Sequence, residues 1–309
     1  MIAHYPDDPP PRWHNPVLAL GNFDGLHRGH AKIIDRVRRR AGERGGTPAA
    51  MTFDPHPARV VRPDKAPPLL MTSEQRLEAL GRAGMQGVAV VRFTREMSLW
   101  DPETFVRTVL VEWLRVVEVW VGANFLFGHD RAGTFSVLRT LGSRYGFRAE
   151  KIDAVRYKDF VVSSTRIRRL VSEGRVDEAG ALLGHHYFID GTVVRGDARG
   201  REIGFPTANL DTPNELLPPA GVYATTAAIE GIELPSVTNI GVRPTFGGGA
   251  MRVETHLLTG SKDLYDTRMR LSFVQRLRDE RAFPDVDALR AQIEADCRAA
   301  RRLFGRISL

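Results

Sequence analysis

Two histidines, His27 and His30, lie three residues apart in the stretch LALGNFDGLHRGH (residues 18–30), which also contains three glycines. A short apolar run precedes the glycines and a helical pattern follows, so the segment predicts a strand-to-helix turn. The backbone N–H groups and the dipole at such a helix start favour a bound anion. Imidazoles three residues apart share one helix face. The pair would therefore donate N–H groups to a phosphate and stabilise charge that develops there.

Two other interpretations of the pair stay open. A zinc site needs a third protein ligand and usually a supporting carboxylate, and only Asp24 lies nearby in the sequence. Both histidines could also be ordinary surface residues. A P-loop is excluded, because no Gly-Lys-Ser/Thr follows the glycines.

A second cluster lies in GTVVRGDARGREIGFPTANL (residues 191–210), where Gly196, Gly200 and Gly204 recur at four-residue spacing. The pattern predicts a glycine-rich hairpin with a rigid turn, and a plain barrel corner is the alternative. Thr207 and Asn209 are two residues apart, so a strand would place both on one face. Their oxygens are hard ligands that suit Mg²⁺ bridging nucleotide phosphates.

The first half of the chain alternates apolar runs with helical patterns. The runs predict buried strands at 17–21, 49–53, 87–93 and 116–122. The helical patterns cover 29–45, 72–84 and 101–114, and Asp101 before Pro102 predicts the start of the last one. Such alternation predicts a parallel sheet with helices on both faces, whose ligands bind beyond the carboxyl ends of the strands near a switch in strand order. The histidine stretch follows the first predicted strand.

The pattern changes near residue 184. Segments 163–174 and 175–184 predict two successive helices, with Ser163 or Ser164 at the start of the first and Gly184 at the end of the second. Short strands are then expected at 221–229, 234–241, 252–258 and 269–277, with a loop tip at 246–250 and a helix over 285–304. We therefore predict two domains, residues 1–184 and 185–309. The second is an all-β barrel or sandwich closed by a C-terminal helix.

Composition limits the functional classes. The 309 residues are 42% hydrophobic and 26% charged, as in soluble globular proteins. The single cysteine, Cys297, rules out a disulfide within the chain, and no signal peptide or spanning helix is expected, so the predicted location is the cytoplasm. A net charge of +7 favours anionic partners. No basic block alternates with aromatic residues, which argues against nucleic acid. We expect small-molecule substrates, no membrane partner, and a monomer or weak homo-oligomer.

The residues 21–30, GNFDGLHRGH, resemble the adenylyltransferase signature of the bifunctional riboflavin kinase/FMN adenylyltransferases, the prokaryotic FAD synthetases. MTFDPHP (51–57), VGANFLFGHDRAGT (121–134) and SSTRIR (163–168) resemble the family's further motifs in order. The resemblance implies a Rossmann-like nucleotidyltransferase fold with His27 and His30 catalytic. It implies ATP binding by Gly21, Phe23, Asp24, Gly25, His27, His30, Ser164, Thr165 and Arg168. It implies flavin binding by His56, Asn124 and Phe127, although a core phenylalanine is the alternative for Phe127.

The 191–210 segment is similar to the riboflavin kinase signature, and GVYA (221–224), NIGVRPTF (239–246), VETHLL (253–258) and LRDERAF (277–283) extend the likeness. It implies a riboflavin-kinase-type barrel in which Thr207 and Asn209 bind Mg²⁺ and ATP phosphate beside Gly196, Gly200 and Gly204. It also implies that Glu254 is the base for the ribityl 5′-hydroxyl. From the residues alone, Glu254 could equally be an exposed strand glutamate. The chain departs from the family pattern at LLTG (257–260), at Asp266, where glycine is usual, and at Ala282, where lysine is usual.

Together the two resemblances imply an enzyme that phosphorylates riboflavin with ATP to FMN, then transfers AMP from a second ATP to FMN, giving FAD and pyrophosphate. Mg²⁺ is the implied cofactor, ATP the co-substrate, and riboflavin, FMN and FAD are substrates or products. A relative with one silent site is the alternative. A flavin- or RNA-binding module without turnover would leave Glu254 and the histidine pair unexplained.

Overall fold

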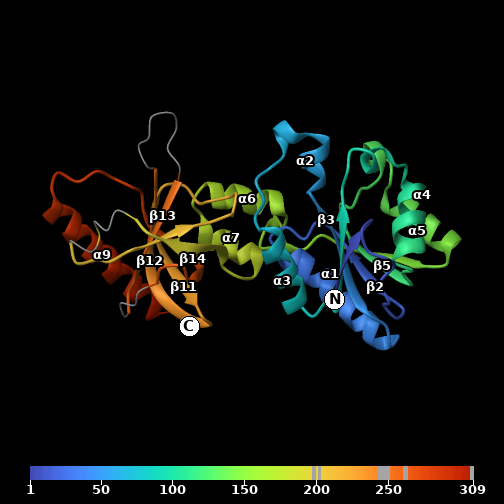
Figure 1. Ribbon diagram of the computed structural model, residues 1–309, viewed down its shortest axis with the longest axis horizontal. Helices are drawn as coiled ribbons and strands as arrows, with labels where there is room; N and C mark the ends of the chain where they lie inside the picture. Colours follow the sequence, from blue (N-terminus) through green and yellow to red (C-terminus); the bar gives the residue numbers. More distant parts are fainter. Residues whose placement is uncertain (197–199, 201–202, 243–250, 260–263, 307–309) are drawn as a thin grey trace. The chain divides into compact units, whose positions relative to one another are not determined.

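The chain forms two compact units, Met1–Ser164 and Thr165–Leu309 (Figure 1). The computed structural model describes residues 1–196, 200, 203–242, 251–259 and 264–306, so the loop tip expected at 246–250 lies outside the described residues. The two units divide after Ser164, whereas the predicted boundary is at residue 184. The helices α6 (Ser164–Ser172) and α7 (Val176–Leu183) cover the stretch from one position to the other. The domain boundary near residue 184 stays a prediction.

The first unit is built on a six-stranded parallel sheet with the order β1-β4-β3-β2-β5-β6. The strands are β1 (Ile2–Tyr5), β2 (Val17–Leu20), β3 (Pro48–Asp54), β4 (Gly87–Arg92), β5 (Glu118–Gly122) and β6 (Arg148–Ile152). The four predicted strands are confirmed. The strands β1 and β6 were not predicted, and because β1 precedes β2, the histidine stretch follows the second strand and not the first. Both missed strands lie at sheet edges, where polar residues interrupt the apolar pattern.

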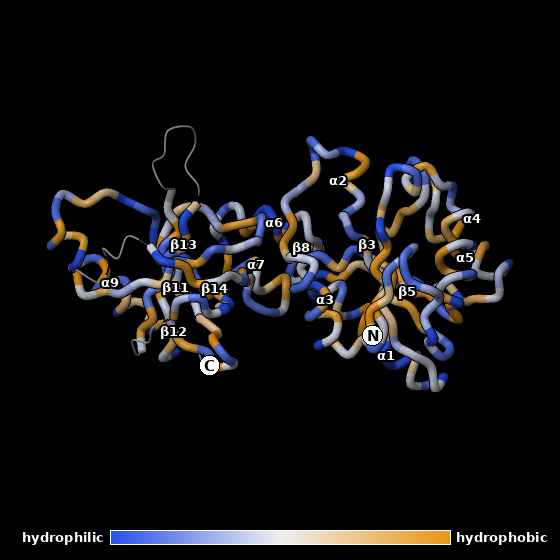
Figure 2. Tube along the Cα trace, viewed as in Figure 1, coloured by the Kyte–Doolittle hydropathy of each residue, from blue (hydrophilic) through white to orange (hydrophobic). Residues whose placement is uncertain are grey.

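Helices cover both faces of this sheet, as predicted, and Figure 2 shows its central strands as mainly hydrophobic segments. In β2, Leu18 and Leu20 pack in one core, while Val17 and Ala19 pack in the other. The helices are α1 (Arg28–Glu43), α2 (Pro57–Val61), α3 (Ser73–Arg82), α4 (Pro102–Phe105) and α5 (Phe135–Tyr145). A π-helix, Val106–Trp113, continues α4. The remaining short elements are 3₁₀ turns at Pro63–Lys65, Met97–Leu99 and His129–Arg131, and a hairpin of β7 (Arg156–Tyr157) and β8 (Phe160–Val161).

Two predicted helix ends are confirmed in detail. Asp101 caps α4, where its carboxylate accepts a hydrogen bond from the Thr104 N–H at 3.0 Å. Gly184 ends α7 with a φ of 89°, the left-handed conformation that glycine adopts at least cost. The helix expected over 101–114 is found in place, but it changes to π-helix after Phe105.

The second unit is a closed antiparallel barrel with the order β10-β13-β12-β11-β14-β9, which decides between the barrel and the sandwich. Its strands are β9 (Tyr187–Val194), β10 (Ala208–Asp211), β11 (Gly221–Ile229), β12 (Ile232–Val242), β13 (Met251–Leu257) and β14 (Arg268–Arg278). The C-terminal helix α9 (Val286–Phe304) begins after Asp285, whose side chain caps it, and packs Cys297, Ala300 and Phe304 against the barrel. The predicted fold class, a barrel with a C-terminal helix, is confirmed.

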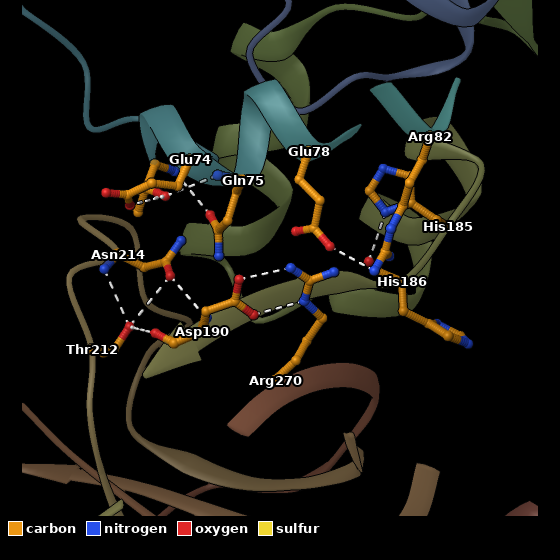
Figure 3. A network of polar contacts seen from close by, with 11 residues as sticks. Glu74, Gln75, Glu78, Arg82, His185, His186, Asp190, Thr212, Asn214 and Arg270 are labelled. Atoms are coloured by element: carbon orange, nitrogen blue, oxygen red, sulfur yellow. Dashed lines mark hydrogen bonds and ion pairs between the residues drawn. The ribbon is translucent and has the colours of Figure 1, made fainter. Parts of the chain in front are cut away.

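Polar contacts also help to close the barrel. The strands β9 and β14 are joined by an ion pair of Asp190 with Arg270, at 2.7 and 2.8 Å, and Asn214 accepts from the Asp190 backbone N–H (Figure 3). Four buried hydroxyl groups on β11, β12 and β13 are linked in a row of hydrogen bonds: Thr225, Ser236, Thr238 and Thr255. Each buried hydroxyl has a partner there, so this row is compatible with a stable core.

No helix within the described ranges is both long and apolar enough to cross a membrane.

Candidate active sites

The histidine pair lies where a strand of the first unit gives way to a helix. The strand β2 lies between β3 and β5, where the strand order reverses, and it ends at Leu20. Gly25 takes a φ of 82° in the turn, and α1 begins at Arg28. His27 is the N-cap of α1, and its Nδ1 accepts from the His30 N–H at 3.3 Å. The predicted strand-to-helix turn at a switch in strand order is confirmed.

The two imidazoles are stacked on each other. Their ring centroids are 3.7 Å apart and their planes differ by 12°, while Phe23 meets His30 edge-on at 5.2 Å. His27 is only 7% exposed, which contradicts the surface-histidine interpretation. Burial and the neighbouring His27 hold the pKa of His30 well below 6.5, because both disfavour a cation. His30 is therefore neutral at pH 7.

Hydrogen bonding also defines which atoms of the pair can act. Since Nδ1 of His27 accepts a hydrogen bond, Nε2 carries the proton in the neutral ring. The His30 Nδ1 is buried and has no hydrogen-bond partner within the described part of the chain. In that same part, no three His, Cys, Asp or Glu side chains gather as a metal site. The geometry suits hydrogen bonding to an anion.

Gly29 has a steric role beside His27. A Cβ on Gly29 would lie 3.0 Å from Cε1 and 3.1 Å from Nδ1 of His27, closer than ordinary contact. Gly21 differs, because a Cβ there would meet the Phe23 ring at 3.5 Å, an ordinary distance. The glycine between the histidines thus makes room for the imidazole.

Asp24 ties a second loop to the end of β2. Its carboxylate is 2% exposed and accepts from the backbone N–H groups of Leu70, at 3.0 Å, and Met71, at 3.1 Å. Its carbonyl accepts from the Ser164 hydroxyl at 2.9 Å. These contacts position the loops around the histidine pair. ATP contact by Asp24, expected from the resemblance, stays a prediction.

His56 joins the ends of β2 and β3. It caps α2, where its Nδ1 accepts from the Ala58 N–H at 3.2 Å, and its Nε2 lies 3.1 Å from the Asn22 side-chain amide. The proton of the neutral ring therefore sits on Nε2, and the amide oxygen of Asn22 is the matching partner, since amide O and N atoms exchange by a flip. Sequence reasoning missed Asn22. Its position between Gly21 and Phe23, inside the predicted anion-binding turn, could have pointed to it.

The segment after β5 holds two predicted flavin contacts of different character. Asn124 is exposed. Phe127 is 9% exposed and packs in the core against Phe105, at 5.8 Å, and Phe125, at 5.3 Å between centroids. Phe127 is thus the core residue that was left open as its alternative, and flavin contact by either side chain stays a prediction.

The SSTRIR motif falls at the start of α6. Ser164 is the first residue of this helix, Thr165 is exposed, and Arg168 is half-buried one turn on. The division between the two compact units runs between Ser164 and Thr165. Phosphate binding by these three residues stays a prediction.

In the barrel, Glu254 lies in a row of polar residues across three strands. It is in register with Asn209 on β10 and with Asn239 on β12. Its neighbours Val253 and Thr255 are buried inside the barrel, so Glu254 lies on the outer face. The Glu254 side chain is 27% exposed and accepts from Arg252 Nη1 at 3.0 Å. It is more enclosed than the freely exposed strand glutamate that was the alternative.

The glycine-rich segment lies against Asn209 and Thr207. A Cβ on Gly196 would fall 2.0 Å from Asn209 Nδ2, and one on Gly200 would fall 3.1 Å from Thr207 Oγ1. Gly204 takes a φ of 85°. These three glycines leave the space and the backbone freedom that this hairpin needs. Because β10 begins at Ala208, Thr207 immediately precedes the strand that carries Asn209.

Three barrel residues escaped sequence reasoning: Asn239, Arg252 and His256. His256 Nδ1 bonds the Pro206 carbonyl at 2.9 Å, which fixes the turn before Thr207. Each of the three lies two residues along the same strand face from Glu254 or directly opposite it. The alternation of β13 was the signal that could have found Arg252 and His256.

The donor set near Glu254 fits Mg²⁺ that arrives with a nucleotide. Thr207 and Asn209 offer neutral oxygens, and the Glu254 carboxylate, in register with Asn209, adds a negative charge beside them. Mg²⁺ prefers oxygen ligands and is usually bound by one or two carboxylates together with substrate phosphates. The protein oxygens alone would make a weak site, and ATP would complete it.

Comparison with known proteins identifies both units. Residues 10–166 match the FAD synthetase family, and residues 183–304 match the riboflavin kinase family. A bifunctional riboflavin kinase/FMN adenylyltransferase from Pseudomonas fluorescens is 39% identical over 93% of this chain and 92% of its own length. The chain belongs to the bifunctional riboflavin kinase/FMN adenylyltransferase family. The family member from Escherichia coli K12 is 37% identical over 94% of this chain and 93% of its own.

A solved structure shares the fold of this family member along nearly its whole length. It is titled a macrolide-efflux protein from Streptococcus pneumoniae, with a TM-score of 0.88, 27% identity, and coverage of 97% of this chain and 98% of that one. The family matches, in contrast, concern flavin synthesis in both units. The chain is thus an enzyme that combines a riboflavin kinase with an FMN adenylyltransferase, as the sequence predicted.

One departure from the family pattern has a structural explanation. Asp266 takes a φ of 61°, the left-handed region where glycine is favoured, and its N–H donates to the Val193 carbonyl at 2.9 Å. Aspartate tolerates this region better than most residues. Ala282 lies exposed before α9, and nothing in the structure explains the loss of a lysine there.

Proposed function

We propose that the polar row around Glu254 is the kinase active site. In this proposal Glu254 accepts the proton of the riboflavin 5′-hydroxyl while that oxygen attacks the γ-phosphorus of ATP and ADP leaves. Thr207 and Asn209 hold the phosphates and Mg²⁺, which supplies neutralising charge when bound. The register of Asn209 with Glu254 supports this assignment, since it brings phosphate ligand and base to one outer face of the barrel.

The histidine pair is the proposed adenylyltransferase site. There, an FMN phosphate oxygen attacks the α-phosphorus of a second ATP. The bond from that phosphorus to the oxygen that bridges it to the β-phosphate breaks, and pyrophosphate leaves. His27, His30 and the backbone N–H groups at the start of α1 stabilise the developing negative charge. No covalent enzyme intermediate is required, so catalysis is positioning and charge stabilisation. The hydrogen bond that His27 Nδ1 accepts leaves Nε2–H of that ring as a donor to the phosphate.

Further roles follow from the motifs. Gly21, Phe23, Gly25, Ser164, Thr165 and Arg168 are proposed ATP contacts, and His56, Asn124 and Phe127 proposed flavin contacts. The protein is proposed to act in the cytoplasm on small molecules without a nucleic-acid partner, as a monomer or weak homo-oligomer. The observation that carries the proposal is that each polar cluster lies within the segment matching its own enzyme family.

Product analysis tests the proposal. Purified protein is incubated with riboflavin, ATP and Mg²⁺, and the flavins are separated by chromatography over time. FMN should appear first and FAD after it, and chelation of Mg²⁺ should stop FMN formation. FMN without FAD would overturn the assignment of the first unit, and FAD from FMN but none from riboflavin would overturn that of the barrel.

A further inference from the structure

The strand β13 carries a second charged residue beside Glu254. Arg252 and Glu254 are two residues apart on the outer face of the barrel, and Arg252 Nη1 donates to Glu254 Oε1 at 3.0 Å. The side chains are 26% and 27% exposed, so neither charge is freely solvated. A pair that is partly withdrawn from water is stronger than one at full exposure.

The contact engages only one carboxylate oxygen. Within the described residues, Glu254 Oε1 accepts from Arg252, and Oε2 has no hydrogen bond. A general base needs a free lone pair at a fixed place within hydrogen-bond reach of its proton donor. Holding Oε1 restricts rotation of the glutamate side chain and leaves Oε2 available.

A second acidic residue, Glu280, lies on the same face of the barrel as Arg252. In the register, Arg252 faces Gly241 on β12, and a Cβ on Gly241 would lie 2.6 Å from Glu280 Oε1. Glu280 thus brings a second carboxylate to the position opposite Arg252. The acidic residues on this face of the barrel therefore include Glu280 as well as Glu254, which pairs with the guanidinium.

We propose that Arg252 is a positioning residue that orients Glu254 for the kinase reaction. The guanidinium acts through the carboxylate and does not itself contact the reacting atoms. This inference rests on the proposed role of Glu254 as the base.

The test compares Arg252→Met, Arg252→Lys and the control Arg268→Met in the full chain. Arg268 is exposed at the start of β14. Arg252→Met should lower kcat for FMN formation about 10- to 100-fold, the usual effect of misplacing a catalytic group. Both KM values should stay within about 3-fold, because substrate binding is not the lost function. Arg252→Lys should recover part of kcat, and Arg268→Met should match wild type.

FAD formation from supplied FMN uses the other unit and should not change in the same samples, and the KM values and the Arg252→Lys rescue report on the barrel itself. In the double variant, Arg252→Met should add little to the loss of kcat caused by Glu254→Gln, because the effects of two residues that act together are not additive. A rise in KM for ATP at unchanged kcat, or wild-type kcat in Arg252→Met, would overturn the positioning role. Loss of kcat in the double variant beyond that in Glu254→Gln would do so too. If Glu254→Gln itself keeps full kinase activity, the failure lies in the proposed base.

Discussion

Replacing Gly29 by alanine probes the geometry of the histidine pair without removing either histidine. The new Cβ would lie 3.0 Å from His27 Cε1, where ordinary contacts begin at 3.4 Å, so the ring must move by a few tenths of an ångström. The bond from the His30 N–H to His27 Nδ1 is already long at 3.3 Å, and the displacement lengthens it further. The substitution therefore shifts the imidazole that we assign to the adenylyl transfer.

The expected effect on stability is small. Weakening the cap costs about 0.5–2 kcal/mol, and alanine in place of helical glycine contributes up to about 1 kcal/mol in the other direction. The free energy of unfolding should therefore fall by no more than about 2 kcal/mol. FAD formation from FMN should fall about 10- to 100-fold, since a small displacement of a catalytic group is enough to slow the reaction by that factor.

Gly42→Ala, in the same helix, is the matched control. Apart from the backbone of its own helix, no heavy atom of the described residues lies within 4 Å of a Cβ at Gly42, so this change should stabilise the chain by about 0.5–1 kcal/mol and leave both activities intact. The assay follows FAD formation from FMN and FMN formation from riboflavin in each variant. Full FAD synthesis by Gly29→Ala, or an equal loss of both activities, would refute the reasoning.

Other predictions concern stability. Because His30 stays neutral in the folded chain while the unfolded histidine gains a proton below pH 6.5, stability should fall from pH 7 to pH 5. His30→Gln should flatten this slope in urea unfolding, and an unchanged slope would contradict it. Thr238→Val removes the hydroxyl partner of Thr255 and one of the two hydroxyl partners of Thr225, and it should cost about 1–3 kcal/mol in thermal unfolding, whereas Thr238→Ser should cost less. Asp266→Gly should stabilise by up to about 1 kcal/mol and Asp266→Ala should destabilise, and the reverse order would show that the positive φ carries no strain.

Strong periodic signals made much of the fold predictable. Central strands such as β2 and β4 are buried on both faces, so they appear as unbroken apolar runs. The caps at Asp101 and Gly184 follow from backbone chemistry that acts within a few residues. The edge strands β1 and β6 were missed because pairing with a neighbour stabilises them, and a single segment does not display its neighbour.

The sites divide in the same way. The histidine pair was predictable from spacing, since three residues along a helix bring two side chains together. The role of Asp24 was not, because its partners at Leu70 and Met71 come from a distant segment. Asn239 became visible only with the strand register, which places it opposite Glu254.

The central claim is that two independent sites, one at the histidine pair and one at Glu254, carry the two reactions. The most direct measurement mixes His27→Ala protein with Glu254→Gln protein and follows FAD formation from riboflavin, ATP and Mg²⁺. Each variant alone should make little FAD, since one stops at FMN and the other makes little FMN. The mixture should make FAD readily, because free FMN passes from one protein to the other. Failure of the mixture, or ready FAD synthesis by either variant alone, would contradict the account.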